Sequence, residues 1–245
     1  MVDSVWFNVT NVLIAGILII YLPIAGLIES NKRKNVINVN KVKDYYSQSL
    51  WSFLPVAIIT VPLILGFITF DKLGFRLISI QSSKIPKVFI VIVISFFLLH
   101  VLYNIYSILM LKFNKNARDQ TAKSIDKNIY NFLPITKEEQ KAWKIVALSA
   151  GLTEEIVYRG YIFFIVSYYV QDISVYIIVL ISSVIFGIGH VYQGKDVIKP
   201  LIIGFLYGLY YVVLQSILPV ILIHILQDLI VAYIFDEDNS KKSST

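Results

Sequence analysis

The chain has 245 residues, of which 57% are hydrophobic and only 16% are charged, and its mean hydropathy is +0.71. Such a composition excludes an ordinary soluble globular domain. Long apolar runs follow one another from near the first residue to residue 235, so no polar segment is long enough to fold as a separate soluble domain. We therefore expect one membrane domain.

The charge and the cysteine count narrow the possibilities further. The formal net charge is +6, but the basic residues lie in short loops between apolar runs. This placement favours the lipid bilayer with its anionic headgroups as a partner, and we expect no nucleic acid. Cysteine is absent, which excludes disulfide scaffolds, thiolate zinc sites and cysteine nucleophiles.

Seven apolar runs are long enough to cross a bilayer, whose core takes about 20 residues of helix. We expect helices because lipid cannot satisfy the open edge of a sheet. The first run follows Asp3 without a basic residue and lacks a small-residue cleavage site, so it is expected to be a retained span rather than a signal peptide. The predicted fold class is all-α, a polytopic transmembrane bundle with seven or eight spanning helices. The predicted spans are residues 5–28, 51–70, 87–111, 142–167, 174–191, 197–215 and 217–235.

The basic residues of the loops predict the orientation of the bundle, because Lys and Arg accumulate on the cytoplasmic side. The loops after the first and third spans are rich in them, whereas the loops near residues 170 and 216 have none. We therefore expect an integral membrane protein with its N-terminus outside and its polar tail, residues 236–245, in the cytoplasm. The basic residues of the two loops are Lys32, Arg33, Lys34, Lys41, Lys43, Lys112, Lys115, Arg118, Lys123, Lys127, Lys137 and Lys141.

One loop opposes this orientation. The stretch "DKLGFRLISIQSSKIPK" carries Lys72, Arg76, Lys84 and Lys87, yet it falls on the outer side. Either loop 71–87 is re-entrant or interfacial, or the chain has one span more than the seven predicted here.

The polar loop 112–141 ends in "LPITKEEQKAW", where Pro134 stops the preceding structure. Thr136 and Glu139 have the spacing of a capping box, so the next helix is expected to begin near residue 137. At about 1.5 Å per residue, Glu154 and Glu155 then lie roughly 20–25 Å along that helix, below the lipid headgroups.

The stretch "GLTEEIVYRG" places three ionisable groups in this helix. A charged side chain near the bilayer centre costs about 2.5–3.5 kcal/mol, so Glu154, Glu155 and Arg159 would together cost roughly 9 kcal/mol if unpaired. Glu155 and Arg159 are four residues apart and can pair on one helix face. Glu154 lies about 100° around the helix from Glu155 and remains available for another contact.

Two later spans carry further polar patterns. "FGIGH" places Phe186 and His190 four residues apart near the end of the fifth span, and "HILQDLI" places His224 and Asp228 four apart in the last span. Carboxylates and imidazoles on different helices are the groups that a polar cavity for proton transfer inside a membrane needs.

These three patterns, in this order and on three apolar helices, resemble the CPBP family, which comprises the CAAX prenyl endopeptidases of the Rce type and the bacterial Abi-domain proteins. The resemblance covers roughly residues 134–232, with "TEEIVYRG" intact. The first three spans match only loosely, through the "DKLGF" stretch.

The resemblance implies an intramembrane endopeptidase of the glutamate type. Glu154 and His190 would activate a water molecule for attack on a peptide carbonyl, and no cofactor is implied. His224 and the residue at position 228 would stabilise the oxyanion. An apolar pocket makes a carboxylate a stronger base, and hydrogen-bond donors at an oxyanion are each worth about 3–4 kcal/mol, so the physical chemistry agrees with these roles.

The same resemblance implies a supporting role for Glu155 and Arg159, which would hold the helix in place, and we expect Phe186 to pack beside the site. It also implies a division into N-terminal transmembrane helices with a cytoplasmic loop, residues 1–133, and a four-helix catalytic core, residues 134–235. Residues 236–245 form the polar tail, and the partner is a membrane-associated peptide or protein substrate.

This chain has Asp at position 228, where Asn is one of the two residues that the family uses. Asn would donate a hydrogen bond to an oxyanion, whereas an ionised Asp228 would repel it. We expect Asp228 either to orient His224 as a hydrogen-bond acceptor or to stay protonated.

Other functions remain open at this point. Glu and two His could hold zinc, although the H-E-x-x-H spacing is missing. Some relatives act in bacteriocin immunity or as membrane scaffolds, and a transporter is a further alternative, although matching halves are not visible. The abundance of Lys, Asn and Ile favours a bacterial source. A peptide signal, pheromone or bacteriocin precursor is then a better substrate than a prenylated CAAX tail.

Two features outside the motifs have structural interpretations. His100, in "FFLLHVLYN", lacks a motif partner and is expected to pack or to make a hydrogen bond. Gly204 and Gly208 form a G-x-x-x-G pattern, which predicts close approach between two helices.

Overall fold

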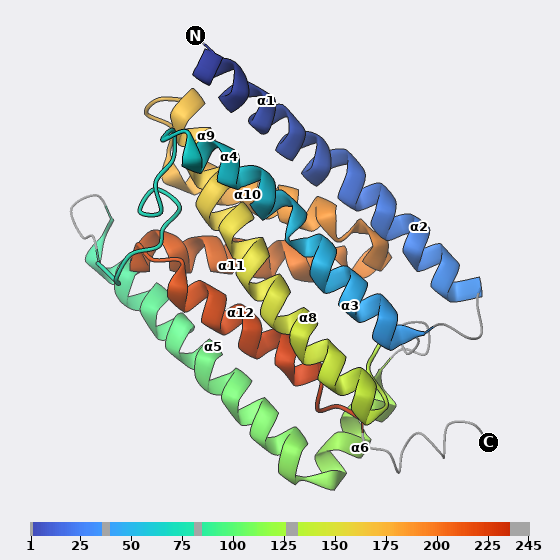
Figure 1. Cartoon of the computed structure of the whole chain (residues 1–245). Helices are drawn as coiled ribbons and strands as arrows, with labels where there is room; N and C mark the ends of the chain where they lie inside the picture. The colour runs from blue at the N-terminus through green and yellow to red at the C-terminus, as the bar shows by residue number, and fades with distance from the viewer. Residues whose placement is uncertain (1, 36–39, 81–84, 126–131, 236–245) are drawn as a thin grey trace.

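The computed structural model describes residues 2–35, 40–80, 85–125 and 132–235 (Figure 1). All regular secondary structure within these ranges is helical, which confirms the predicted all-α fold. The predicted polar tail lies outside the described residues.

A long helical rod and a broken helix form one side of the bundle (Figure 1). The rod consists of α1 (Val2–Gly16), the π-helical turn η1 (Ile17–Tyr21) and α2 (Leu22–Asn35), and the broken helix of α3 (Lys41–Ser52) and α4 (Leu54–Ile64).

The second span lies earlier in the chain than the predicted residues 51–70. The apolar helix occupies Lys41–Ile64. It begins earlier because the Asn40 side chain caps α3 by accepting from the Lys43 amide. It ends earlier because Gly66 adopts a φ of +78°, a left-handed conformation that stops a helix.

The next helix, α5 (Lys87–Phe113), runs along the opposite side of the molecule and is followed by α6 (Lys115–Ser124) (Figure 1). The predicted span 87–111 is thus confirmed. The polar loop 112–141 contains α6, which was not predicted; Asn114 caps its first turn by accepting from the Ala117 amide.

The C-terminal half contains the helices with the ionisable motifs. The first is a continuous helix of α8 (Lys137–Glu155), the π-helical turn η2 (Ile156–Tyr161) and α9 (Ile162–Tyr169). The chain continues through α10 (Val175–Gly189), the 3₁₀ segment η3 (Val191–Val197), α11 (Ile198–Leu214) and α12 (Leu218–Val231). The Thr136 side chain and Glu139 cap α8 reciprocally, which confirms the predicted capping box and the predicted start at residue 137.

Four helical segments of the described chain are long and apolar enough to cross a membrane, namely Val5–Asn31, Lys41–Ile64, Lys87–Phe113 and Val191–Leu214. Two shorter apolar helices, Val175–Gly189 and Leu218–Val231, accompany them. The helix of α8, η2 and α9 is also long, but ionisable residues interrupt its apolar sequence. The protein is an integral membrane protein, and these helices agree with the predicted bundle of seven or eight.

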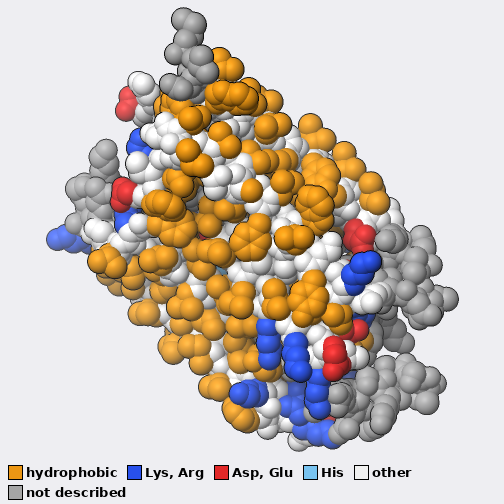
Figure 2. Space-filling view, viewed as in Figure 1, with side chains coloured by type: hydrophobic (Ala, Val, Ile, Leu, Met, Phe, Trp, Pro, Cys, Tyr) orange, Lys and Arg blue, Asp and Glu red, His pale blue; other side chains and the backbone are white. Residues whose placement is uncertain are grey.

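The surface of the molecule matches this conclusion. Figure 2 shows a broad hydrophobic surface, with Lys and Arg side chains gathered at its two ends. Large apolar side chains remain exposed along the helices, among them Ile64 at 81%, Leu50 at 73% and Val88 at 72%. In water such a surface would drive aggregation, whereas lipid covers it without cost.

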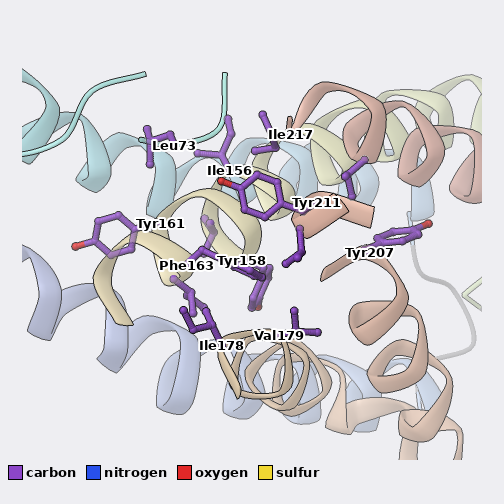
Figure 3. Close-up of a cluster of buried hydrophobic side chains, with 14 of the residues drawn as sticks. Leu73, Ile156, Tyr158, Tyr161, Phe163, Ile178, Val179, Tyr207, Tyr211 and Ile217 are labelled. Atoms are coloured by element: carbon purple, nitrogen blue, oxygen red, sulfur yellow. The ribbon is translucent and has the colours of Figure 1, made fainter. Parts of the chain in front are cut away.

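Close helix approach positions the elements of the C-terminal half. A Cβ on Gly208 would lie 2.9 Å from Val179 Cγ1, and one on Gly204 would lie 3.2 Å from Phe186 Cδ1, so α10 and α11 meet where both residues lack side chains. This contact confirms the predicted G-x-x-x-G role. Figure 3 shows the core beside it, with Tyr158 and Tyr211 labelled.

Candidate active site

The centre of the site is a buried ion pair on α8 and η2. Arg159 Nη1 donates to Glu155 Oε1 at 2.8 Å, and both side chains are fully buried. Arg159 Nη2 donates to the Gly204 carbonyl at 2.9 Å, which ties η2 to α11. The guanidinium also lies 5.0 Å from the ring centroid of Phe186 and 5.4 Å from that of Tyr207. The charge of Arg159 is therefore balanced by a carboxylate, a carbonyl and two aromatic faces.

Glu155 makes a second contact, with α12. Its Oε1 lies 2.7 Å from His224 Nδ1, and because a carboxylate oxygen accepts, Nδ1 carries the proton and donates. The imidazole of His224 is thereby held by the same oxygen that pairs with Arg159. The two contacts join three helical elements through one carboxylate.

The other nitrogen of His224 faces two further carboxylates. Nε2 lies 3.8 Å from Glu154 Oε2 and 3.7 Å from Asp228 Oδ2. Both distances exceed that of a direct hydrogen bond. The His224 side chain is only 7% exposed, whereas Glu154 and Asp228 are 28% and 31% exposed. Glu154 and Asp228 therefore stand where the buried cluster opens to its surroundings.

His190 occupies the end of α10. It is the C-terminal cap of that helix, and its Nδ1 lies 2.8 Å from the Phe186 carbonyl. A carbonyl can only accept, so Nδ1 donates and satisfies one of the carbonyls that a helix end leaves without a partner. The neutral ring then keeps a lone pair on Nε2, which is the form that a base or a water-binding group requires.

Phe186 brings the two histidines into one site. Its ring centroid lies 4.6 Å from that of His190 and 6.2 Å from that of His224. Tyr158 packs edge-on against the same ring at 4.9 Å. Phe186 therefore packs within the site, as predicted, and its ring contacts both histidines.

The three sequence patterns thus meet in space, and the comparison with protein families matches the same segment. Residues 141–230 match the family model described as type II CAAX prenyl endopeptidase Rce1-like. This part of the chain is therefore similar to the Rce1-like family. The match covers somewhat more than a third of the chain and includes all of the site residues. Comparisons with curated proteins and with solved structures found no significant match.

The match agrees with the resemblance that the motifs indicated, and it supports a CAAX-type intramembrane protease. The N-terminal helices α1 to α5 lie outside the matched segment.

Some features of the matched segment could not be predicted from the motifs. The contact between Glu155 and His224 joins residues 69 positions apart, and helical spacing carries no signal for it. The π-helical turn η2 begins directly after Glu155 and was also missed. Such turns inside α-helices recur at functional sites.

His100 makes the hydrogen bonds that were expected of it. Its Nε2 lies 3.1 Å from Gln227 Oε1 and its Nδ1 lies 3.3 Å from Tyr210 Oη. Gln227 Oε1 also accepts from Tyr207 Oη at 2.8 Å. Because Gln227 Oε1 accepts, His100 Nε2 carries the proton. This network joins α5 to α11 and α12 beside His224, whose ring centroid lies 5.3 Å from that of Tyr207.

A zinc site would need several ligand side chains close together. Within the described ranges, His, Cys, Asp and Glu side chains form no group of three or more arranged to hold a metal ion.

Proposed function

We propose that this protein is an endopeptidase that hydrolyses a peptide bond of a membrane-associated peptide or protein, with a water molecule activated by Glu154 and His190. The observation that carries this proposal is the arrangement of the cluster. Glu155, Arg159 and His224 are buried and fixed by direct contacts, whereas Glu154 beside them is partly exposed. A general base must reach both water and substrate, and Glu154 is the carboxylate of the EE pair that can do so.

The reaction needs one proton to move. Glu154 would take a proton from water as the oxygen attacks the carbonyl carbon, and the same carboxyl group would return that proton to the departing amine. His190 Nε2, free to accept because Nδ1 donates to the Phe186 carbonyl, would hold the second hydrogen of the water and orient it.

His224 is suited to the oxyanion. With Nδ1 fixed by Glu155, its Nε2 is directed to the side of Glu154 and Asp228. A protonated Nε2 would donate to the oxygen of the tetrahedral intermediate in a site with little water, where such a donor is worth about 3–4 kcal/mol. Glu155 would stabilise the resulting positive charge on the ring.

Composition and chemistry support the proposed source and substrate. The abundance of Lys, Asn and Ile favours a bacterial cell membrane, and a bacterial substrate would be a peptide signal, pheromone or bacteriocin precursor. A prenylated CAAX protein is the alternative substrate that the family description names for its own members.

The test is a comparison of membrane peptides from cells that carry the wild-type protein, Glu154→Gln or Glu138→Gln. Glu138 lies exposed in the first turn of the same helix, so its variant is a matched control for the loss of one carboxylate. We expect a peptide product that is present with wild type and Glu138→Gln and absent with Glu154→Gln. Identical peptide profiles and an unchanged phenotype for all three proteins would favour a scaffold or immunity protein and contradict the enzyme.

A further inference from the structure

A polar cavity lies between the loop after α4 and the ends of α9 and α11. Its volume is about 190 Å³. Since one water molecule needs only about 10–15 Å³ of such space, the cavity has room for a small charged group. Its polar lining consists of Lys72, Arg76, Ser167, Tyr211 and Gln215. These residues take no part in the candidate active site.

The loop that carries the two basic residues is fixed to the helices. Arg76 Nη2 donates to Gln215 Oε1 at 3.1 Å, and the Arg76 carbonyl accepts from Ser216 Oγ at 2.6 Å. The Ile217 amide donates to the Gly74 carbonyl at 2.9 Å. Figure 3 shows Ile217 and Leu73, the residue before Gly74, near Tyr211. The cavity wall is therefore built into the fold.

Gly74 makes this docking possible. It has a φ of +84°, which a residue with a side chain rarely adopts, and an added Cβ would lie 2.7 Å from Tyr211 Cε2. The loop can therefore lie directly against α11 only with glycine at this position.

The cavity carries an excess of positive charge. Arg76 Nη1 lies 3.6 Å from Asp71 Oδ2, but the Asp71 side chain is 68% exposed and neutralises only one of the two cations. Lys72 Nζ lies 5.5 Å from the ring centroid of Phe164 and has no ion-pair partner within the part of the chain that the structure describes. An ammonium over an aromatic face is held in place and still has donors for an anion.

The surroundings of the cavity are those of a membrane boundary. Both α9 and α11 end beside it, at Tyr169 and Leu214. Tyr168 and Tyr169 are 53% and 55% exposed, and Phe70 on the loop is 61% exposed. Exposed aromatic residues at the ends of spanning helices are typical of the headgroup region, where lipid phosphates lie.

We propose that this cavity binds the phosphate group of an anionic phospholipid. Lys72 and Arg76 supply charged donors, and the Ser167 hydroxyl supplies a neutral one. The proposal also explains why a basic loop lies on the predicted outer side. Its cations would bind a lipid phosphate there, so they need not mark the cytoplasmic side.

Native mass spectrometry of the full chain, purified in detergent, tests this site. The probes are dioleoyl phosphatidylglycerol, dioleoyl phosphatidylcholine and inorganic phosphate. We expect the wild-type protein to retain phosphatidylglycerol in preference to phosphatidylcholine. Lys72→Gln should bind phosphatidylglycerol about tenfold more weakly, because it lacks one charge-assisted hydrogen bond. Among the described residues the Lys72 side chain makes no hydrogen bond or ion pair to the loop or the helices, so this variant is expected to fold.

Lys112→Gln is the matched control, because Lys112 Nζ lies 5.2 Å over the Phe113 ring at the other end of α5. It should bind phosphatidylglycerol as the wild type does. Equal binding by Lys72→Gln and Lys112→Gln would overturn the proposal. Retention of inorganic phosphate without retention of either lipid would overturn the lipid as its source.

Discussion

At the scale of single residues, Glu155 has a larger structural role than its position beside Glu154 indicates. One of its oxygens accepts from both Arg159 and His224, so a single buried carboxylate fixes the helix of the EE motif and the imidazole of α12. A buried pair of this kind adds little net stability over an apolar pair, but removal of one partner leaves an uncompensated charge.

Arg159→Met should therefore reduce the free energy of unfolding by about 3–5 kcal/mol, because it leaves Glu155 buried without its cation. Denaturant unfolding in detergent measures the change. The control is Lys199→Met, which removes an exposed pair with Asp196 at 2.8 Å and should cost no more than about 1 kcal/mol. Equal losses for the two variants would contradict the role given to the buried pair.

Asp228 is expected to be less important for hydrolysis than its position in the motif indicates. Glu155 already fixes the Nδ1 proton of His224, and Asp228 Oδ2 lies 3.7 Å from Nε2. Asp228→Asn should therefore retain hydrolysis within about tenfold of wild type, since it loses no direct hydrogen bond and gains an amide donor. A loss of 100-fold or more in initial rate would show that the carboxylate itself is required.

The resemblance predicted which residues form the site, but helical spacing predicts contacts only between parts that are close along the chain. The Glu155 and Arg159 pair follows from helical spacing, since four residues make about one turn. The contact of His224 with Glu155 depends on how α12 packs against α8, which spacing does not specify. His190 Nδ1 donates to the Phe186 carbonyl because α10 ends at Gly189. The sequence shows no unambiguous helix stop at that residue.

At the scale of helices, the approach of α8 to α12 decides whether Glu154 and His224 meet. Gly151 lies one turn before Glu154, and an added Cβ would be 2.5 Å from Ile225 Cγ1 and 3.1 Å from the Ile225 backbone nitrogen. The second contact cannot be relieved by a rotamer change. The helices can therefore lie at this separation only with glycine at position 151.

Gly151→Ala should lower activity by at least about tenfold, because α8 and α12 must separate and a misplacement of about 1 Å at a catalytic group costs up to 100-fold. The initial rate of peptide hydrolysis measures the effect. Gly16→Ala is the control, since nothing lies within 4 Å of its added Cβ, and its rate should match wild type. Equal rates for both variants would contradict the importance of this contact.

At the scale of the whole molecule, a hydrophobic surface separates two charged ends (Figure 2). Length and hydropathy were sufficient to predict an all-helical bundle of about seven or eight membrane helices. They were insufficient to predict where the second span begins, because the capping by Asn40 and the turn at Gly66 decide that. They also did not show that the loop after α4 docks against α11, which depends on the Gly74 contact with Tyr211.

The proposed orientation places the end near residue 171 outside and the end near residue 116 in the cytoplasm. The chain has no cysteine, so single cysteines can report each end without a background. Gln171 and Asn116 are both exposed. A membrane-impermeant maleimide should label Gln171→Cys in intact cells. It should label Asn116→Cys only after the cells are permeabilised. The reverse pattern would contradict the orientation and would place the basic cavity on the cytoplasmic side.

The central claim is that Glu154 and His190 act on the same water molecule. Its most direct test is the initial rate of hydrolysis by reconstituted wild type, Glu154→Gln, His190→Gln and the double variant, with the peptide that the cellular comparison identifies. Each single substitution should lower the rate by at least about 100-fold, and the double variant should be no slower than the slower single one, because groups that act as a unit are not additive. Losses that multiply in the double variant, or a Glu154→Gln rate equal to wild type, would contradict the proposed mechanism.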